Sequence, residues 1–468
     1  MIGRAKEIEI LEKKYNSTES EFIAVYGRRR VGKTYLIRTQ FQDRISFQFT
    51  GTANSNLQLQ LLNFEIAIKE QYPAYEGKIK SWSDAFQVLK VIIENNTASK
   101  KVIFIDELPW LDSKNSNFLQ ALEHFWNAWA SARKDIVLIV CGSTASWMIN
   151  KLINHKGGLH NRITAKLKIE PFTLAECKEF AQEKELVLSD FQIIELYMVL
   201  GGIPFYWNTI EKGKSVFQMV QSICFEKNGL LRNEFTNVFK SLFLHGEKHE
   251  AIIEAIASKN KGLTREEIIK LSGFSNGGSL TRMLKELEES GFIRSYSAFG
   301  FKSKNMLYQL VDFFSAFYLK FIKPNLKQEV NWLAKIDTSE YLVWSGYAFE
   351  QVCLSHVRQI KTALGIEGID SSIYSWKSSQ STDGAQIDLI IDRKDKVINI
   401  CEMKFSALPY VLSKSDDLNL RNKFAVFKSE TKTNKSLQLV FISPYGCIQN
   451  TYSALIQNNI KIEDLFYN

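Results

Sequence analysis

The sequence predicts an α/β protein of several domains, and three features of the chain support this class. Residues 1–170 alternate short apolar runs with amphipathic stretches, which is typical of strands and helices that alternate around a parallel sheet. Residues 171–330 are mostly helical in pattern, and residues 331–468 return to mixed strands and helices. With 468 residues, the chain is long enough for roughly two to four domains.

The composition is ordinary for a soluble globular protein, with 45% hydrophobic and 24% charged residues. The formal net charge of +8 is compatible with a nucleic-acid partner but does not require one. No stretch approaches the roughly 18 consecutive apolar residues of a membrane span, and the charged N-terminus lacks a signal-peptide core. The six cysteines are scattered, without a CxxC pair. We therefore expect a cytoplasmic protein with no membrane partner.

The helical middle of the chain divides into two parts. Residues 171–245 are expected to form a helical lid on the first domain. Residues 246–330 predict three helices followed by two short strands, which is the order of a winged helix-turn-helix. Its third helix would present Asn276, Ser279, Thr281, Arg282 and Lys285 to DNA, and its wing Lys302 and Lys304. The alternative is an internal role, in which this domain transmits the state of the first domain.

A phosphate-binding loop is predicted at residues 27–34, where GRRRVGKT matches G-x-x-x-x-G-K-[ST] between an apolar strand and a helix. Glycines in such a loop let backbone N–H groups surround phosphates, and the helix N-terminus adds a favourable dipole. Lys33 is expected to reach the β- and γ-phosphates of ATP, and Thr34 to bind Mg²⁺. The expected nucleotide contacts in this loop are Gly27, Arg28, Arg29, Arg30, Val31, Gly32, Lys33, Thr34 and Tyr35. We expect the three arginine side chains to be solvated or to bind an acidic partner.

Polar residues at the ends of later strands extend this site. Asp106 ends the apolar run VIFID and would join the Mg²⁺ shell, while Glu107 would orient the attacking water or cap the next element. Ser143, with Thr144, follows the run DIVLIVCG and would contact the γ-phosphate or the water, or cap a helix. Arg162 would act as an arginine finger, sense the γ-phosphate in cis, or lie on the surface.

Six segments carry a family resemblance: MIGRAKEIEIL, GRRRVGKT, VIFIDELPWL, CGST, NRITAKL and GGIP, in this order. The chain resembles, over essentially its whole length, prokaryotic AAA+/STAND-like P-loop ATPases that carry a C-terminal nuclease-like domain of unknown function. The resemblance implies that Gly3 and Arg4 lie near the adenine. It also implies that GGIP, with Pro204, contacts the nucleotide from the lid, although a tight interhelical turn would explain GGIP equally. Asn161 stands where relatives often carry glycine before the arginine.

A second candidate site lies in residues 331–468. Glu402 and Lys404 are two residues apart in VINICEMKFS, so they share one face of a predicted strand. Asp388 lies on the preceding strand of a predicted hairpin, and Glu350 on an upstream helix. This order resembles the restriction-endonuclease-like, or PD-(D/E)xK, fold.

That second resemblance implies a chemistry for the four residues. Asp388 and Glu402 would hold Mg²⁺, Lys404 would position water or neutralise developing charge, and Glu350 would complete the cluster. The alternative is an inactive remnant in which Glu402 and Lys404 form a salt bridge at a wet edge.

Two functional hypotheses follow for the whole chain. In the first, an ATPase that uses ATP and Mg²⁺ couples its nucleotide state to DNA binding or to metal-dependent DNA cleavage. In the second, the chain is a STAND-type regulatory switch that changes its assembly with ATP, as a homo-oligomer, and its inactive C-terminal domain only binds nucleic acid or a protein. A small-molecule phosphotransferase is disfavoured because no acceptor site is evident.

Overall fold

The computed structural model describes residues 1–154, 157–159, 161–243, 245–297, 299–300, 306–378 and 384–467. The chain divides into two compact units, which are described separately below. The first unit comprises Met1–Pro171, Val238–Gly246 and Arg282–Gly291, and the second comprises Phe172–Asn237, Glu247–Thr281 and Phe292–Asn468. No helix in the described part of the chain is both long and apolar enough to cross a bilayer.

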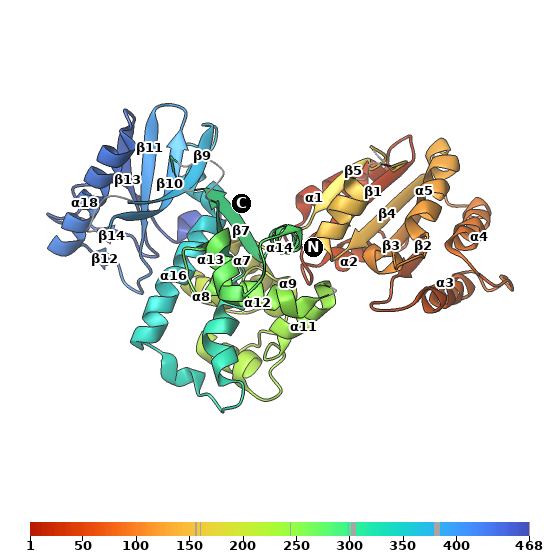
Figure 1. The fold of residues 1–468 in the computed structure, drawn as a ribbon, viewed down its shortest axis with the longest axis horizontal. Coiled ribbons are helices and arrows are strands. Elements are labelled where there is room, and N and C mark those ends of the chain that lie inside the picture. The colour runs from red at the N-terminus through yellow and green to blue at the C-terminus, as the bar shows by residue number, and fades with distance from the viewer. Residues whose placement is uncertain are drawn as a thin grey trace. The chain divides into compact units, whose positions relative to one another are not determined.

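The first unit is built on a five-stranded parallel sheet with the strand order β2-β3-β4-β1-β5 (Figure 1). Continuous apolar runs suit strands that are covered on both faces, and β1, β3 and β4 are buried along almost their whole length. The α/β class with a parallel sheet is thus confirmed. The strands are β1 (Glu21–Tyr26), β2 (Ile45–Thr50), β3 (Lys101–Asp106), β4 (Ile136–Gly142) and β5 (Ala165–Lys168).

Helices α1 to α6 accompany this sheet, and two of them, α3 and α4, begin at a residue whose side chain caps the first turn. Ser81 accepts a hydrogen bond from the Asp84 N–H and starts α4, whose apolar face then enters an aromatic core with Phe64 and Phe118. The helices are α1 (Ala5–Tyr15), α2 (Lys33–Gln40), α3 (Leu57–Gln71), α4 (Trp82–Glu94), α5 (Phe118–Ala128) and α6 (Ala145–Trp147).

The predicted lid region begins with α7 (Leu174–Glu183), α8 (Asp190–Leu200), α9 (Pro204–Trp207), α10 (Val216–Val220) and α11 (Glu234–Leu242). A capping box between Thr173 and Glu176 starts α7. The backbone N–H of Leu174 donates to His356 Nε2 at 3.1 Å, while His356 Nδ1 donates to the Val352 carbonyl at 2.8 Å. Burial lowers the pKa of His356 to about 4, so this histidine is neutral where it joins α7 to the end of α16 (Ser339–Ser355).

The described residues of the segment predicted as a winged helix form α12, α13, α14, the short α15 (Phe313–Phe317) and a small antiparallel sheet of order β6-β8-β7. A capping box between Thr264 and Glu267 starts its second helix. Its winged-helix identity stays a prediction, and Lys302 and Lys304 lie outside the described residues. Its elements are α12 (Gly246–Ala257), β6 (Leu263–Thr264), α13 (Arg265–Ser272), α14 (Gly278–Glu289), β7 (Ile293–Ser297) and β8 (Met306–Leu310).

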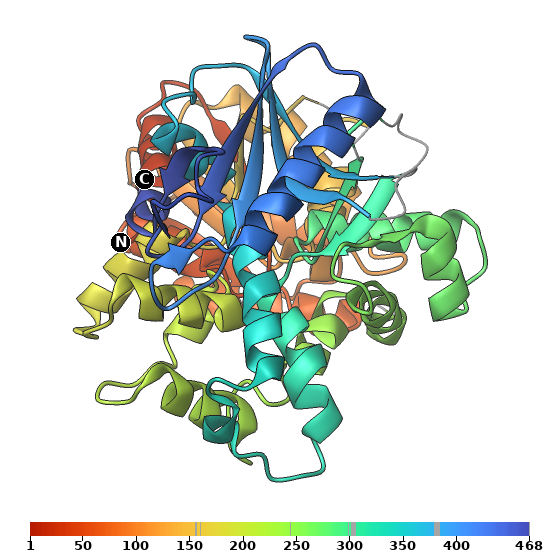
Figure 2. The same ribbon diagram turned by 90° about the vertical axis from the view of Figure 1, so that its left-hand side faces the viewer.

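The C-terminal part contains a mixed five-stranded sheet of order β15-β13-β11-β10-β9. The predicted hairpin is present, because β10 pairs with β11 in antiparallel register. Leu420 and Phe427 of α18 share a buried core with Ile390 and Ile400, so this helix covers one face of the sheet (Figure 2). The elements are α16 (Ser339–Ser355), α17 (Val357–Ala363), β9 (Ser371–Lys377), β10 (Gln386–Arg393), β11 (Val397–Met403), β12 (Tyr410–Val411), α18 (Lys414–Thr431), β13 (Ser436–Ile442), β14 (Cys447–Ile448) and β15 (Ile456–Ile460).

Glu195 on α8 links protonation to the stability of the second unit. Its carboxyl oxygen accepts a hydrogen bond from the Tyr341 hydroxyl at 3.3 Å, and burial raises its pKa to about 7. A carboxyl with a raised folded-state pKa favours folding below its unfolded pKa of about 4.5, and this contribution is lost as the pH rises through 7. Ionisation of Glu195 therefore opposes folding at alkaline pH by roughly 3 kcal/mol.

We expect Glu195→Gln, which cannot ionise, to raise the melting temperature relative to the wild type at pH 8.5 more than at pH 5. Thermal unfolding followed by circular dichroism at both pH values measures this difference. Glu183→Gln is the control, because Glu183 is exposed at the end of α7 and should show no such pH dependence. An equal effect of Glu195→Gln at both pH values would contradict the raised pKa.

Candidate nucleotide and metal sites

The phosphate loop folds around the ammonium group of Lys33. Lys33 Nζ donates to the carbonyl oxygens of Gly27 at 3.0 Å and of Arg28 at 2.7 Å. Gly27 has a φ of +142°, and a side chain there would put its Cβ 2.4 Å from the Ile169 carbonyl oxygen, so only glycine fits. Burial lowers the pKa of Lys33, while the nearby carboxylates of Glu107 and Asp106 act in the opposite direction.

Thr34 and Asp106 meet beside this loop, as expected for a shared Mg²⁺ site. The Thr34 hydroxyl donates to Asp106 Oδ2 at 2.8 Å, and Asp106 is buried at the end of β3. A hydroxyl and a single carboxylate in contact fit Mg²⁺, which is usually held by few protein oxygens and by the phosphates of the nucleotide. When bound there, the ion would neutralise charge on the phosphates.

Glu107 follows Asp106 directly and contacts the end of the neighbouring strand. Its backbone is left-handed with φ of 50°, and Oε2 accepts hydrogen bonds from the Ser143 hydroxyl at 2.8 Å and the Ser143 N–H at 3.3 Å. Left-handed backbone is uncommon for residues other than glycine and is found at functional sites. The structure therefore joins two residues that the sequence singled out separately, and Ser143 orients the Glu107 carboxylate.

The N-terminal segment is bound to the phosphate loop through Arg4. This side chain is buried, and Arg4 Nη2 donates to the carbonyl oxygens of Val31 and Glu170, both at 3.0 Å. It therefore ties the phosphate loop to the residues that follow β5. The expected position of Gly3 and Arg4 near the adenine stays a prediction.

One arginine of the phosphate loop, Arg28, is more buried than expected. Arg28 is buried, with 7% of its surface exposed, so the first of its two expected roles, a solvated side chain, is wrong, and binding to an acidic partner stays a prediction. Arg28 lies two residues after the end of β1, whereas Arg29 and Arg30 are partly exposed. Tyr35 is exposed on α2.

Two further predicted residues stay untested as nucleotide contacts. Arg162 is exposed in the turn before β5, which suits each of its three expected roles. Pro204 starts α9 in the second unit, where Gly201 ends α8 with φ of 58°. A Cβ on Gly202 would lie 1.9 Å from the Phe172 carbonyl oxygen, so GGIP forms the tight interhelical turn that was the alternative.

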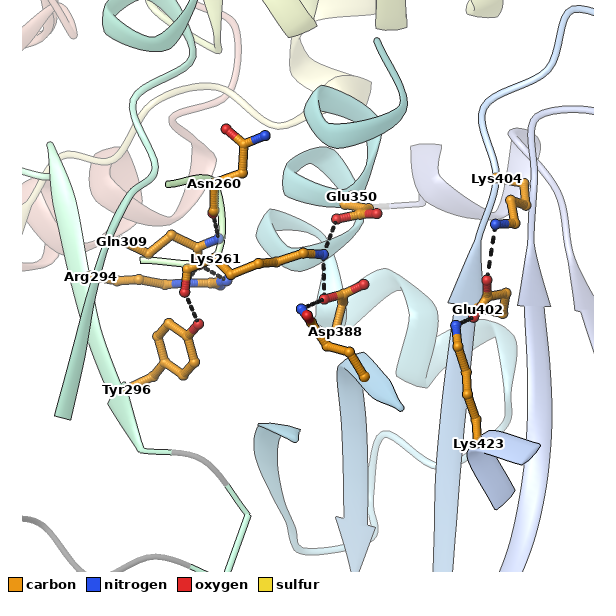
Figure 3. Close-up of polar contacts among 11 residues, drawn as sticks. Asn260, Lys261, Arg294, Tyr296, Gln309, Glu350, Asp388, Glu402, Lys404 and Lys423 are labelled. Atoms are coloured by element: carbon orange, nitrogen blue, oxygen red, sulfur yellow. Dashed lines mark hydrogen bonds and ion pairs between the residues drawn. The ribbon is translucent and has the colours of Figure 1, made fainter. Parts of the chain in front are cut away.

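In the C-terminal part, Asp388 and Glu350 converge on one cation. Lys261 Nζ lies 2.5 Å from Asp388 Oδ1 and 2.9 Å from Glu350 Oε2 (Figure 3). Gln386 Nε2 also donates to Asp388 Oδ1 at 2.9 Å. The pairing of β10 with β9 is irregular between Ile387 and Ile390, and such bulges re-aim side chains.

Glu402 is neutralised by two other lysines. Its carboxylate lies 3.1 Å from Lys404 Nζ and 2.7 Å from Lys423 Nζ of α18 (Figure 3). The β10–β11 pairing ends at Leu389 and Cys401, the neighbours of Asp388 and Glu402, so both carboxylates lie at the same end of the hairpin. Within the described ranges, no three His, Cys, Asp or Glu side chains are close enough together to hold a metal ion.

Burial and the closeness of the carboxylates shift the pKa values of Glu350 and Lys261. Burial and the charge of Asp388 raise the pKa of Glu350 to about 7, and Glu402 adds to this effect. Burial acts to lower the pKa of Lys261, but Asp388 and Glu350 outweigh it and the pKa is raised. Carboxylate oxygens are the ligands that Mg²⁺ prefers, and these two now pair with a single ammonium, which leaves one net negative charge when both are ionised.

Lys261 and Lys423 were not predicted from the sequence. Lys261 lies 127 residues before Asp388 and 89 before Glu350, and Lys423 lies 21 residues after Glu402. No motif spacing connects them to the carboxylates. The only available signal was indirect, because crowded buried carboxylates require compensating cations.

The loop and the parallel sheet define the first unit as a P-loop ATPase domain. Residues 1–210 match the model of a family described as an ATPase domain predominantly from Archaea, so this part of the chain is similar to archaeal-type ATPase domains. The match extends beyond the first unit through α7, α8 and α9, and therefore includes the GGIP turn.

Two relatives come from Methanocaldococcus jannaschii. An uncharacterized protein is 29% identical over 413 residues, which cover 87% of this chain and 88% of that protein. An uncharacterized ATP-binding protein is 44% identical over 43 residues, which cover 9% of this chain and 73% of that protein. The first similarity spans far more than the ATPase match, so it includes part of the region beyond the ATPase domain.

Solved structures also resemble the chain. A Walker-type ATPase of Pyrococcus abyssi superposes with a TM-score of 0.47 and 18% identity, covering 69% of this chain and 96% of that one. The ORC2 protein of Aeropyrum pernix, solved with ADPNP and ADP, superposes with a TM-score of 0.46 and 15% identity. This match covers 72% of this chain and 96% of that one. The assignment of the ATPase domain rests on the family match and the geometry of the loop.

The contact between Glu107 and Ser143 yields a prediction for ATP hydrolysis. We expect Glu107→Gln to bind ATP normally and to lower kcat by roughly 100-fold or more, since the amide cannot accept a proton from the attacking water. Ser143→Ala should lower kcat less, because it frees the carboxylate without removing it. Phosphate release and nucleotide titration measure both steps.

Glu70→Gln serves as a matched control, because Glu70 is exposed on α3. Lys33→Ala should lose nucleotide binding altogether. Full hydrolysis by Glu107→Gln would show that another group activates the water.

Proposed function

We propose that the chain is an ATP-hydrolysing switch whose nucleotide state controls a C-terminal site for metal-dependent cleavage of DNA. The observation that carries this proposal is that Glu350 and Asp388 both contact the ammonium group of Lys261. Asp388 lies at the same end of the hairpin as Glu402. Carboxylates are rarely brought together in a partly buried place without a functional reason. The archaeal-type ATPase domain supports the nucleotide-dependent half.

In the ATPase domain, each side chain would perform one part of the hydrolysis. Lys33 would leave the loop carbonyls and bind the β- and γ-phosphates, while Thr34 and Asp106 would hold Mg²⁺. Glu107, oriented by Ser143, would accept a proton from the water that attacks the γ-phosphorus. The bond from that phosphorus to the bridging oxygen would break, leaving ADP and phosphate.

In the C-terminal domain, Asp388 and Glu402 would hold the metal, with Glu350 completing the set. The metal would lower the pKa of a water molecule and stabilise charge at the phosphodiester. Lys404 lies beside Glu402 and would neutralise the charge that develops on the phosphate oxygens during attack. Net positive charge over the whole chain favours a polyanionic substrate.

The segment predicted as a winged helix would transmit the nucleotide state. Within the second unit, the Phe299 N–H donates to the Ser375 carbonyl at 2.8 Å, and the Phe299 ring packs against Phe427 and Tyr374. The segment thus contacts both β9 and α18 of the C-terminal domain. This contact favours the internal role over an exposed DNA-binding role for that part of the segment.

Incubation with plasmid DNA tests the proposed DNA cleavage by the C-terminal site. We expect nicking or linearisation with Mg²⁺ or Mn²⁺ that changes with ATP, and loss of cleavage in Asp388→Asn because the metal loses a charged ligand. Asp392→Asn is the matched control: Asp392 lies on the same strand but is paired with Lys435. Cleavage that survives Asp388→Asn would exclude this site as the nuclease.

A second candidate function is a regulatory switch without nuclease activity, and a specific observation favours it. Glu402 is paired with both Lys404 and Lys423, and the described residues contain no group of three metal-ligating side chains. Such a domain would only bind nucleic acid or protein, and ATP would act by changing the assembly of the chain.

A regulatory switch of this kind predicts that the mass of the assembled particle depends on the bound nucleotide. Light scattering after size exclusion should give a larger particle with a non-hydrolysable ATP analogue than with ADP. In Lys33→Ala the difference should disappear, because the loop no longer binds the phosphates. One mass in all conditions would exclude the assembly switch.

A further inference from the structure

The loop between α12 and β6 places Lys261 inside the acidic group of the C-terminal domain. All the residues concerned belong to the second unit. Lys261 belongs to the segment predicted as a winged helix, whereas Glu350 lies on α16 and Asp388 on β10 (Figure 3). The ammonium is within hydrogen-bond distance of a carboxylate oxygen of each, and it also lies 5.5 Å from the centre of the Tyr347 ring.

The backbone of this loop is held in place by three buried or half-buried side chains. The Tyr296 hydroxyl donates to the Lys261 carbonyl at 2.6 Å, and Gln309 Nε2 donates to the Asn260 carbonyl at 2.7 Å (Figure 3). Arg294 Nε in turn donates to Gln309 Oε1 at 2.9 Å, which orients the amide.

Gly262 completes this fixed geometry. It adopts φ of +84°, and a Cβ there would lie 2.6 Å from the Tyr308 carbonyl oxygen. The loop is therefore preorganised by β7 and β8 of the same segment, and Lys261 extends from a defined position.

We propose that Lys261 closes the acidic site by pairing with Asp388, a proposed metal ligand, and with Glu350, so that metal binding requires this side chain to withdraw. The inference rests on the proposed metal site. A single ammonium satisfies both carboxylates as a cation would, but it brings one charge and no open coordination position. The ammonium thus leaves the two ionised carboxylates with one net negative charge, and a residue of the neighbouring segment keeps the site inactive.

The Lys261 side chain can leave the two carboxylates without disrupting packed hydrophobic residues. A pocket of about 800 Å³ lies next to this contact, and its lining includes Ser258, Lys259, Asn260, Tyr347 and Glu350. The loop and α16 are therefore separated by open space along part of their length. Any change that moves the 258–262 loop, including one transmitted from the ATPase domain, would release the two carboxylates for a metal ion.

The test measures Mn²⁺ binding by electron paramagnetic resonance, with the full chain and without nucleotide, at a pH of about 8, which is above the pKa of Glu350. Lys261→Met keeps most of the side-chain volume but removes the charge. We expect it to bind Mn²⁺ at least tenfold more tightly than the wild type, and Lys261→Arg to stay close to the wild type because it keeps the cation. Asp388→Asn, added to Lys261→Met, should abolish the gain.

Lys435→Met is the matched control. Lys435 lies 2.5 Å from Asp392 on the same strand β10, as Lys261 lies 2.5 Å from Asp388, and both lysines are about one-third exposed. Lys435→Met should therefore leave Mn²⁺ affinity unchanged. Thermal unfolding of each variant checks that the chain is folded.

The remaining outcomes separate this inference from the proposed function. Binding that depends on Asp388 but is equally tight in the wild type and in Lys261→Met would overturn the closing role of Lys261 and leave the metal site standing. An equal gain in Lys435→Met would likewise overturn it, since the effect would then be one of general charge. No Asp388-dependent binding in any variant would overturn both the metal site and its closure.

Discussion

Strand β4 lies between β1 and β3 in a sheet whose strands all run in one direction, and this order decides where the chemistry of the first unit collects. The carboxyl ends of parallel strands meet at one edge, so the phosphate loop after β1 and the acidic pair after β3 share that edge with the end of β4. Ser143 therefore stands beside Glu107. Arg4 adds a second constraint, because its guanidinium joins the phosphate loop to the residues after β5.

The C-terminal part depends on a different requirement, the compensation of crowded negative charge. Carboxylates that are taken from water and placed together must be protonated, paired or bound to a cation. Here lysines from three elements meet this need: Lys261 at Asp388 and Glu350, and Lys404 and Lys423 at Glu402. Lysines would compete directly with a metal for the same oxygens, so the same contacts that stabilise the fold would also regulate the site.

The parts of the sites that could be predicted from sequence are those determined by local backbone geometry. Lys33 and Thr34 follow from the spacing of one loop, and the capping box at Thr173 from two residues three apart. The β10–β11 hairpin could also be predicted, since its two apolar runs are joined by a short turn. The solvation of the loop arginines could not be predicted, because the burial of Arg28 depends on what packs over the loop.

The sequence by itself thus determined the nucleotide loop, the acidic residues at strand ends and the order of the elements, because each is recorded in a few consecutive residues. Only the tertiary structure decided which of these residues meet. Glu107 and Ser143 are 36 residues apart, and Lys261 and Asp388 are 127 apart. Such contacts depend on strand order and on the packing of separate segments, which no local pattern of residues encodes.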